Sequence, residues 1–89
     1  MKINESVLLT KDIVVVDIVR LIHLTSSLQP NISIANKTKV VDGKSLLAVL
    51  TLKLHANQII QITVEHKNKK IARNSLDLIV QFINKGFKF

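Results

Sequence analysis

The chain has 89 residues, of which 47% are hydrophobic, and its 13 basic and 6 acidic side chains give a net charge of +7. This length fits one small domain over residues 1–89, and the hydrophobic fraction is high enough to fill its core. The absence of cysteine excludes disulfides and thiolate metal sites, and the low aromatic content of 3% argues against a surface on which nucleic-acid bases stack.

The first third of the chain predicts a strand followed by a helix. Residues 2–10 alternate between apolar and polar side chains, which is typical of a half-buried strand. Residues 11–16 are ambiguous, because their consecutive valines favour extended backbone but precede Asp17, a good helix N-cap. From Asp17 to Ser27 the apolar residues recur at helical spacing, which predicts an amphipathic helix that ends before Pro30.

The rest of the chain predicts three more strands and two more helices from the same two periodicities. They are two short strands within residues 31–41 with a turn at 36–37, a short helix over 44–52, a connector over 53–58, a strand over 60–65 and a helix over 69–84 that stops at Gly86. The order is βαββαβα. Polar residues at alternate strand positions then predict an α+β open-faced sandwich, a four-stranded antiparallel sheet with three helices on one face.

The segment Asp42–Leu50 carries the most specific local signal. An Asp-Gly pair breaks the preceding strand, and Lys44 and Ser45 open a run of helix formers. The hydroxyl of Ser45 can cap this helix as it stands. A phosphoryl group on the same hydroxyl would place a dianion at the positive end of the helix dipole, next to Lys44. From the residues alone, both interpretations of Ser45 stay open.

This element order and chain length, together with the sequence Gly-Lys-Ser-Leu-Leu at 43–47, resemble HPr, the small phosphocarrier of the bacterial sugar phosphotransferase system. The resemblance covers nearly the whole chain and is strongest over residues 27–52. It implies that Ser45 matches the serine that HPr kinase/phosphorylase modifies in Gram-positive bacteria. It also implies that a transcriptional regulator of carbon catabolite repression is a partner of the phosphorylated form. The residues that match the apolar patch for partner proteins are Leu46, Leu47 and Leu50.

The other half of the HPr site departs from the family pattern. HPr carries its phosphoryl group on a histidine in a Gly-[Leu/Ile]-His-Ala-Arg-Pro-Ala motif. An alignment without gaps places Val14 at the histidine, Val16 at the arginine and Asp17 at the proline. Valine has no lone pair with which to accept a phosphoryl group. We therefore expect a binding or regulatory module that neither carries phosphate at this site nor acts as an enzyme.

The apolar run at the former histidine cannot face inward along its whole length. We expect at least one residue of 13–16 to be exposed, so that Val14 and Val15 form an apolar patch beside Leu46 and Leu50. Such a patch suits a protein partner or a second copy of the chain. The alternative is that the apolar run at 13–16 packs under the C-terminal residues Phe87–Phe89. These C-terminal residues themselves either fold back on the core or anchor a partner.

A second group of functional candidates is basic. Its members cluster around the start of the last predicted helix: Lys67, Lys69, Lys70 and Arg73. They form either a solvated face or a docking patch for an acidic partner or a nucleic-acid backbone. A basic nucleic-acid or ribonucleoprotein module is therefore the first alternative function.

The second alternative function is a phosphocarrier in which one of the three histidines accepts the phosphoryl group from a displaced position. His23 falls in the middle of a predicted helix, and His55 and His66 fall in a connector and a turn, so ordinary surface roles are favoured. Their dispersed positions predict no metal site, and no motif predicts a cofactor. The sequence has neither an apolar run of about 18 residues nor a signal-peptide pattern, so we expect a cytoplasmic protein that does not associate with membranes.

Overall fold

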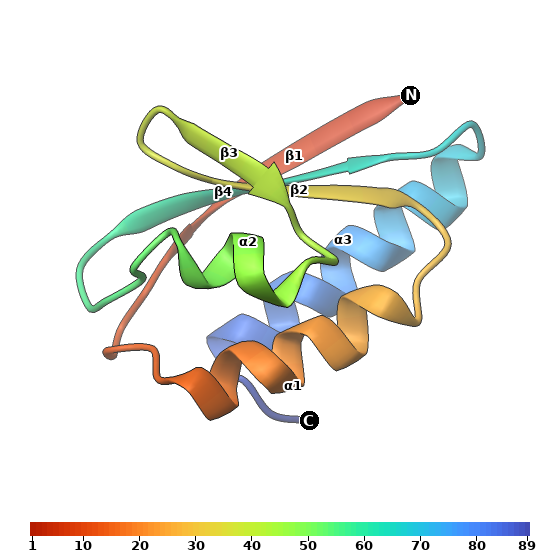
Figure 1. The fold of residues 1–89 in the computed structure, drawn as a ribbon. Helices are drawn as coiled ribbons and strands as arrows, with labels where there is room; N and C mark the ends of the chain where they lie inside the picture. Colours follow the sequence, from red (N-terminus) through yellow and green to blue (C-terminus); the bar gives the residue numbers. More distant parts are fainter.

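The computed structural model describes residues 1–89 as a four-stranded antiparallel sheet whose one face is covered by three helices (Figure 1). The strand order in the sheet is β1-β4-β2-β3, which confirms the predicted α+β open-faced sandwich. The elements are β1 Lys2–Leu8, α1 Val15–Ser26, β2 Asn31–Asn36, β3 Lys39–Asp42, α2 Leu46–Leu50, β4 Ile59–Glu65 and α3 Lys69–Asn84. None of the helices is long and apolar enough to cross a membrane.

The sheet buries alternate residues, as the period-two pattern predicts. In β4, the buried residues Ile60, Ile62 and Val64 point toward the helices, and the residues between them face outward. Ile62 lies opposite Ile34 of β2, which is also fully buried. The outer face of the sheet is left uncovered, because all three helices lie on the other side (Figure 1).

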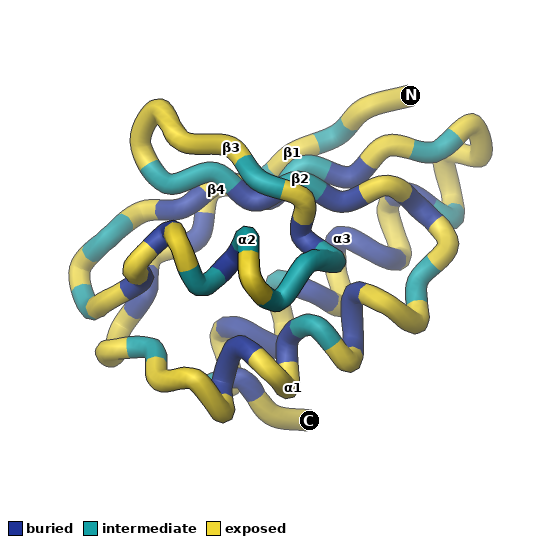
Figure 2. Tube along the Cα trace, in the orientation of Figure 1, coloured by how far each residue is buried: buried dark blue, intermediate teal, exposed yellow.

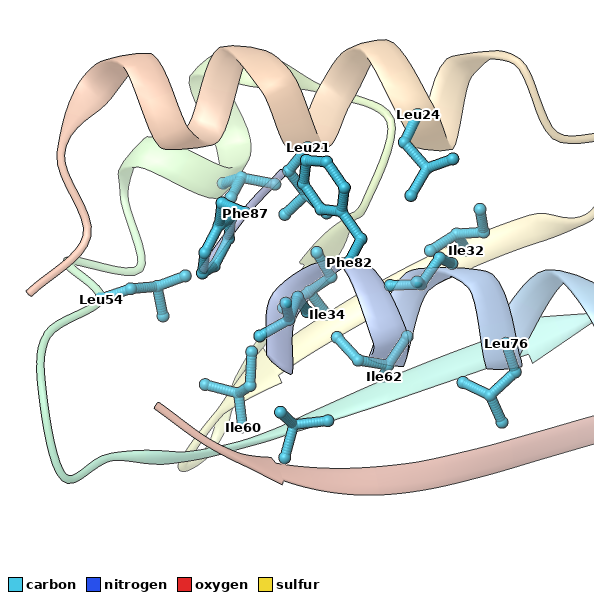
Figure 3. Packing of buried hydrophobic residues seen from close by; sticks show 14 of the residues in the cluster. Leu21, Leu24, Ile32, Ile34, Leu54, Ile60, Ile62, Leu76, Phe82 and Phe87 are labelled. Atoms are coloured by element: carbon cyan, nitrogen blue, oxygen red, sulfur yellow. The ribbon is translucent and has the colours of Figure 1, made fainter. Parts of the chain in front are cut away.

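Residues from every helix and from the C-terminal segment complete the core. Figure 3 shows Leu21 of α1, Leu76 and Phe82 of α3, and Phe87 gathered over the sheet. Phe87 is only 1% exposed, so the chain folds back on the core after α3, which is one of the two predicted alternatives. Gly86 and Phe87 make this turn with φ angles of 84° and 65°. Phe82 of α3 is 2% exposed and belongs to the same core.

Several predicted boundaries were wrong by one to three residues: β1 ends at Leu8 and not at residue 10, and α2 spans Leu46–Leu50 and not 44–52. α1 begins at Val15 with Val14 as its N-cap, so Asp17 is the third helical residue and not the cap. From this position Asp17 still serves as an acceptor for a free backbone N–H at the helix start, because its carboxylate accepts a hydrogen bond from the Val14 N–H at 3.0 Å. The hairpin turn lies at 37–38 and not at 36–37, since Asn36 still pairs with Lys39.

Candidate functional site

The two helices that open at Val14 and Ser45 lie side by side and run in opposite directions (Figure 1). At one end, Thr25 near the end of α1 donates a buried hydrogen bond of 2.7 Å from its Oγ1 to the Gly43 carbonyl, just before α2. At the other end, the Ile13 N–H donates to the Leu54 carbonyl at 3.4 Å, just after α2. Ser45 therefore lies near the end of α1, whereas Val14 lies near the segment that follows α2.

The start of α1 contains an internal ion pair. Asp17 is 2% exposed, and its Oδ1 lies 3.2 Å from Nζ of Lys11. Its Oδ2 accepts the hydrogen bond from the Val14 N–H. The Lys11 Nζ also lies 6.0 Å from the centre of the Phe87 ring. A carboxylate of the chain itself thus bonds to the first free N–H of the helix, where a helix would otherwise attract an external anion.

The Val14 side chain offers no nucleophile at this position. It is 56% exposed and consists only of hydrocarbon. Val16, which the alignment without gaps placed at the arginine of the HPr motif, is 50% exposed and adds no cation. Lys11 supplies the nearby positive charge, and the sequence analysis did not single it out. Lys11 lies six residues before Asp17, and the chain between them is not helical at 11–14. Helical spacing therefore could not indicate that these two side chains pair.

The start of α2 keeps its serine in a capping position. The Oγ of Ser45 accepts one hydrogen bond, from the Ala48 N–H at 3.3 Å, and the residue is half-buried. Asp42 also contributes here, because its Oδ1 accepts from the Lys44 N–H at 2.9 Å. The Nζ of Lys44 turns away and donates to the Leu28 carbonyl at 2.7 Å. The predicted cap is therefore present, and the ammonium group of Lys44 is engaged at the end of α1.

The predicted docking residues divide into exposed and half-buried groups. Val14, Val15 and Leu47 are 56%, 61% and 76% exposed. Leu46 and Leu50 pack partly against the core and are half-buried. Figure 2 shows that the chain is mostly exposed where it enters α1. Val19, which the sequence analysis did not name, lies one turn after Val15 on the same side of α1 and is 39% exposed.

The predicted basic cluster is only partly free of counter-charges. The guanidinium of Arg73 lies 3.3 Å from Asp77 and 3.9 Å from Glu5. The other members make no ion pair and are exposed: Lys67, Lys69 and Lys70. The cluster therefore consists of these lysines beside one arginine that is paired within the fold.

Hydrogen bonds of its two neighbours join His55 to the segment that precedes α1. Its neighbours Leu54 and Ala56 bond to Ile13 and to the carboxylate of Asp12, the latter at 3.0 Å. The His55 ring itself contacts the Gln58 side chain at 3.0 Å. His23 is exposed on α1, as expected for a surface residue.

Helices on one face of a four-stranded antiparallel sheet of order β1-β4-β2-β3 define the open-faced sandwich of small phosphocarrier proteins. The chain belongs to the HPr family, because the family model described as "PTS HPr component phosphorylation site" matches residues 18–84. The matched residues include Ser45 and all of α2, and they begin after Val14.

Solved structures of HPr proteins share the fold at low sequence identity. The phosphocarrier protein HPr from Bacillus anthracis str. Ames has a TM-score of 0.82 and 17% identity, with 91% of this chain and 95% of that chain covered. The histidine-containing phosphocarrier protein of a Mycoplasma has a TM-score of 0.77 and 17% identity, with coverages of 97% and 98%. HPr-C-His from Thermoanaerobacter tengcongensis has a TM-score of 0.70 and 12% identity, with 93% of each chain covered. No curated protein sequence matches the chain.

Proposed function

We propose that this HPr-family protein is a binding or regulatory module that does not carry a phosphoryl group at the start of α1. The observation that supports this most directly is the pair formed by Val14 and Asp17. Val14 occupies the N-cap, and the Asp17 carboxylate already accepts the Val14 N–H. A chain of this kind binds other proteins and catalyses no reaction of its own.

The chemistry of phosphoryl transfer explains why this pair matters. A carrier needs a nucleophile with a lone pair, together with donors and cations that hold the phosphoryl oxygens. Val14 has no such lone pair. The nearest cation, Lys11, is paired with Asp17 at 3.2 Å, so an incoming phosphate would meet a group whose charge is already balanced.

Enzyme I and phosphoenolpyruvate provide the direct test of this part of the proposal. We expect the intact mass of the protein to stay unchanged after incubation with both. The main-chain contacts beside Asp12 and Ile13 make His55 the best candidate for a displaced carrier. A gain of one acid-labile phosphoryl group that disappears in His55→Gln, and persists in the control His23→Gln, would establish the displaced-histidine alternative and overturn the proposal.

Ser45 is the regulatory residue in this proposal. Its hydroxyl makes a single hydrogen bond of 3.3 Å and is only half-buried, so modification sacrifices one weak cap bond. The phosphorylating partner would be HPr kinase/phosphorylase, and the partner of the phosphorylated form a transcriptional regulator of carbon catabolite repression. The exposed side chains of Val14, Val15 and Leu47 provide apolar contacts beside Ser45 or along α1.

Incubation with the kinase shows whether Ser45 is a regulatory phosphorylation site or only a residue that the fold retains as a helix cap. HPr kinase and ATP should label the unaltered protein and the control Ser26→Ala, an exposed serine on α1, but not Ser45→Ala. If the unaltered protein takes up no label while a conventional HPr is labelled in the same mixture, Ser45 serves only as a helix cap.

The exposed lysines near the start of α3 support one other function, binding to nucleic acid. Retention on single-stranded nucleic acid that falls steeply with salt, and that is lost when Lys67, Lys69 and Lys70 are all changed to Gln, would favour it. We expect weak retention instead, because Arg73 is already paired with Asp77 and Glu5.

A further inference from the structure

A groove of about 450 Å³ lies between α1 and the C-terminal segment, apart from α2 and Ser45. Its apolar part is formed by two aromatic rings and a valine. The rings of Phe82 and Phe89 lie 5.0 Å apart between their centres at an angle of 57°. Val19 of α1 also lines the groove. The groove opens to solvent, and its accessible apolar surface consists of Phe89 and Val19, which are 87% and 39% exposed, whereas Phe82 is buried beneath them at 2%.

The rest of the lining carries only basic groups. It consists of Arg20 and His23 from α1 and Lys88 from the C-terminal segment, and no acidic residue takes part. Neither Arg20 nor Lys88 forms an ion pair, since the ion pairs of the fold use Lys11 and Arg73. The groove therefore combines an accessible apolar floor with cations that have no counter-charge within the protein.

We propose that this groove binds an acidic segment of a partner protein in which an apolar side chain stands between carboxylates. The apolar side chain would lie on Phe89 and Val19, the two exposed apolar residues of the groove, where it removes hydrocarbon from water. A carboxylate on one side would pair with the guanidinium of Arg20, which can hold it with two parallel hydrogen bonds. One on the other side would pair with Lys88.

The shape of the groove favours a protein segment over a small molecule. Small-molecule sites enclose most of their ligand, whereas this groove is open to solvent along a helix and the chain that packs beside it. Bare phosphate backbones offer no apolar side chain for the two aromatic rings. The proposal does not depend on phosphorylation of Ser45, because no residue of α2 lines the groove.

The test uses the whole protein labelled with ¹⁵N and three short peptides blocked at both ends. The first has a central phenylalanine flanked by two acidic residues on each side, the second replaces the phenylalanine with alanine, and the third replaces the acids with their amides. We expect saturable amide shifts at Arg20, His23 and Phe89 with the first peptide and clearly weaker binding of the other two. Arg20→Gln and Lys88→Gln should each weaken the first peptide by about threefold, as expected for exposed charge pairs.

Matched controls keep the result interpretable. Lys85→Gln removes an exposed charge just before the segment but outside the groove, so it should bind the peptide like the unaltered protein. Shifts that centre on Lys67–Lys70 would overturn the proposal. Equal binding of the alanine peptide, no saturable binding, or tighter binding of a short oligonucleotide at the same amides would overturn it as well.

Discussion

Replacing Asp17 with alanine tests whether an internal carboxylate holds the start of α1. In the intact protein this carboxylate is 2% exposed, accepts the Val14 N–H at 3.0 Å and lies 3.2 Å from the ammonium of Lys11. Asp17→Ala removes both interactions and leaves the Val14 N–H at the helix start without its partner. We therefore expect a clear loss of stability without a change of fold.

The magnitude follows from the two interactions taken separately. A hydrogen bond between a backbone N–H and a charged acceptor contributes about 1.5–3 kcal/mol. The ion pair adds less than about 1 kcal/mol, because Lys11 is 46% exposed and screened by water. We expect Asp17→Ala to lower the free energy of unfolding by about 2–3 kcal/mol, and Tm by about 8–20 °C for a domain of this size.

Urea unfolding followed by circular dichroism measures this loss, and two further variants divide it. Asp17→Asn keeps an oxygen that can accept the Val14 N–H, so it should lose about half as much as Asp17→Ala. Lys11→Met should cost less than about 1 kcal/mol. The exposed Asp77, which pairs with Arg73 within α3, is the matched control and should cost about 0.5 kcal/mol or less when changed to Ala. A loss for Asp17→Ala no larger than that of this control would refute the reasoning.

Four further substitutions test the contacts that place the site, each by its free energy of unfolding in urea. Gly43→Ala should lose about 1–3 kcal/mol, because the added Cβ would lie 2.6 Å from Cγ2 of Ile32. Asn68→Ala should lose about 1 kcal/mol, since this residue caps α3 through two hydrogen bonds; an unchanged midpoint would contradict that role. Phe87→Ala should lose about 3–5 kcal/mol, whereas Phe89→Ala should lose far less, because the first ring is 1% exposed and the second 87%. Equal losses for the two phenylalanines would show that the chain does not fold back as described.

The periodic parts of the fold could be predicted from the sequence because they depend on neighbours along the chain. The bounds of α3 at 69 and 84 followed from its helical spacing and the glycine that ends it. The strand over 60–65 differs from β4 by one residue. Ser45 could be placed at its helix start for the same reason, since a serine before a run of helix formers indicates an N-cap.

The start of α1 could not be predicted in the same way. Asp17 can satisfy a helix start either as the N-cap or from the third helical position, and residue type alone does not distinguish these two roles. The run of four apolar residues at 13–16 did predict that part of it is exposed, and Val14, Val15 and Val16 all are, but how far each side chain is covered depends on where α2 and the segment after it pack. The hydrogen bond from Thr25 to the Gly43 carbonyl joins residues 18 positions apart, so only the folded chain reveals it.

The two halves of the HPr site differ here in the kind of anion that they can hold. At the start of α1 the anion is part of the chain: the Asp17 carboxylate and Lys11 bind each other permanently, whereas a carried phosphoryl group must arrive and leave. At the start of α2 the Ser45 hydroxyl is half-exposed and bound by one long hydrogen bond, so an added group meets little resistance. These two geometries support the proposal that phosphate is not carried at the first helix and that Ser45 is open to modification at the second. The valine side chains at the start of α1 are exposed, and such an apolar surface supports the proposed contact with other proteins.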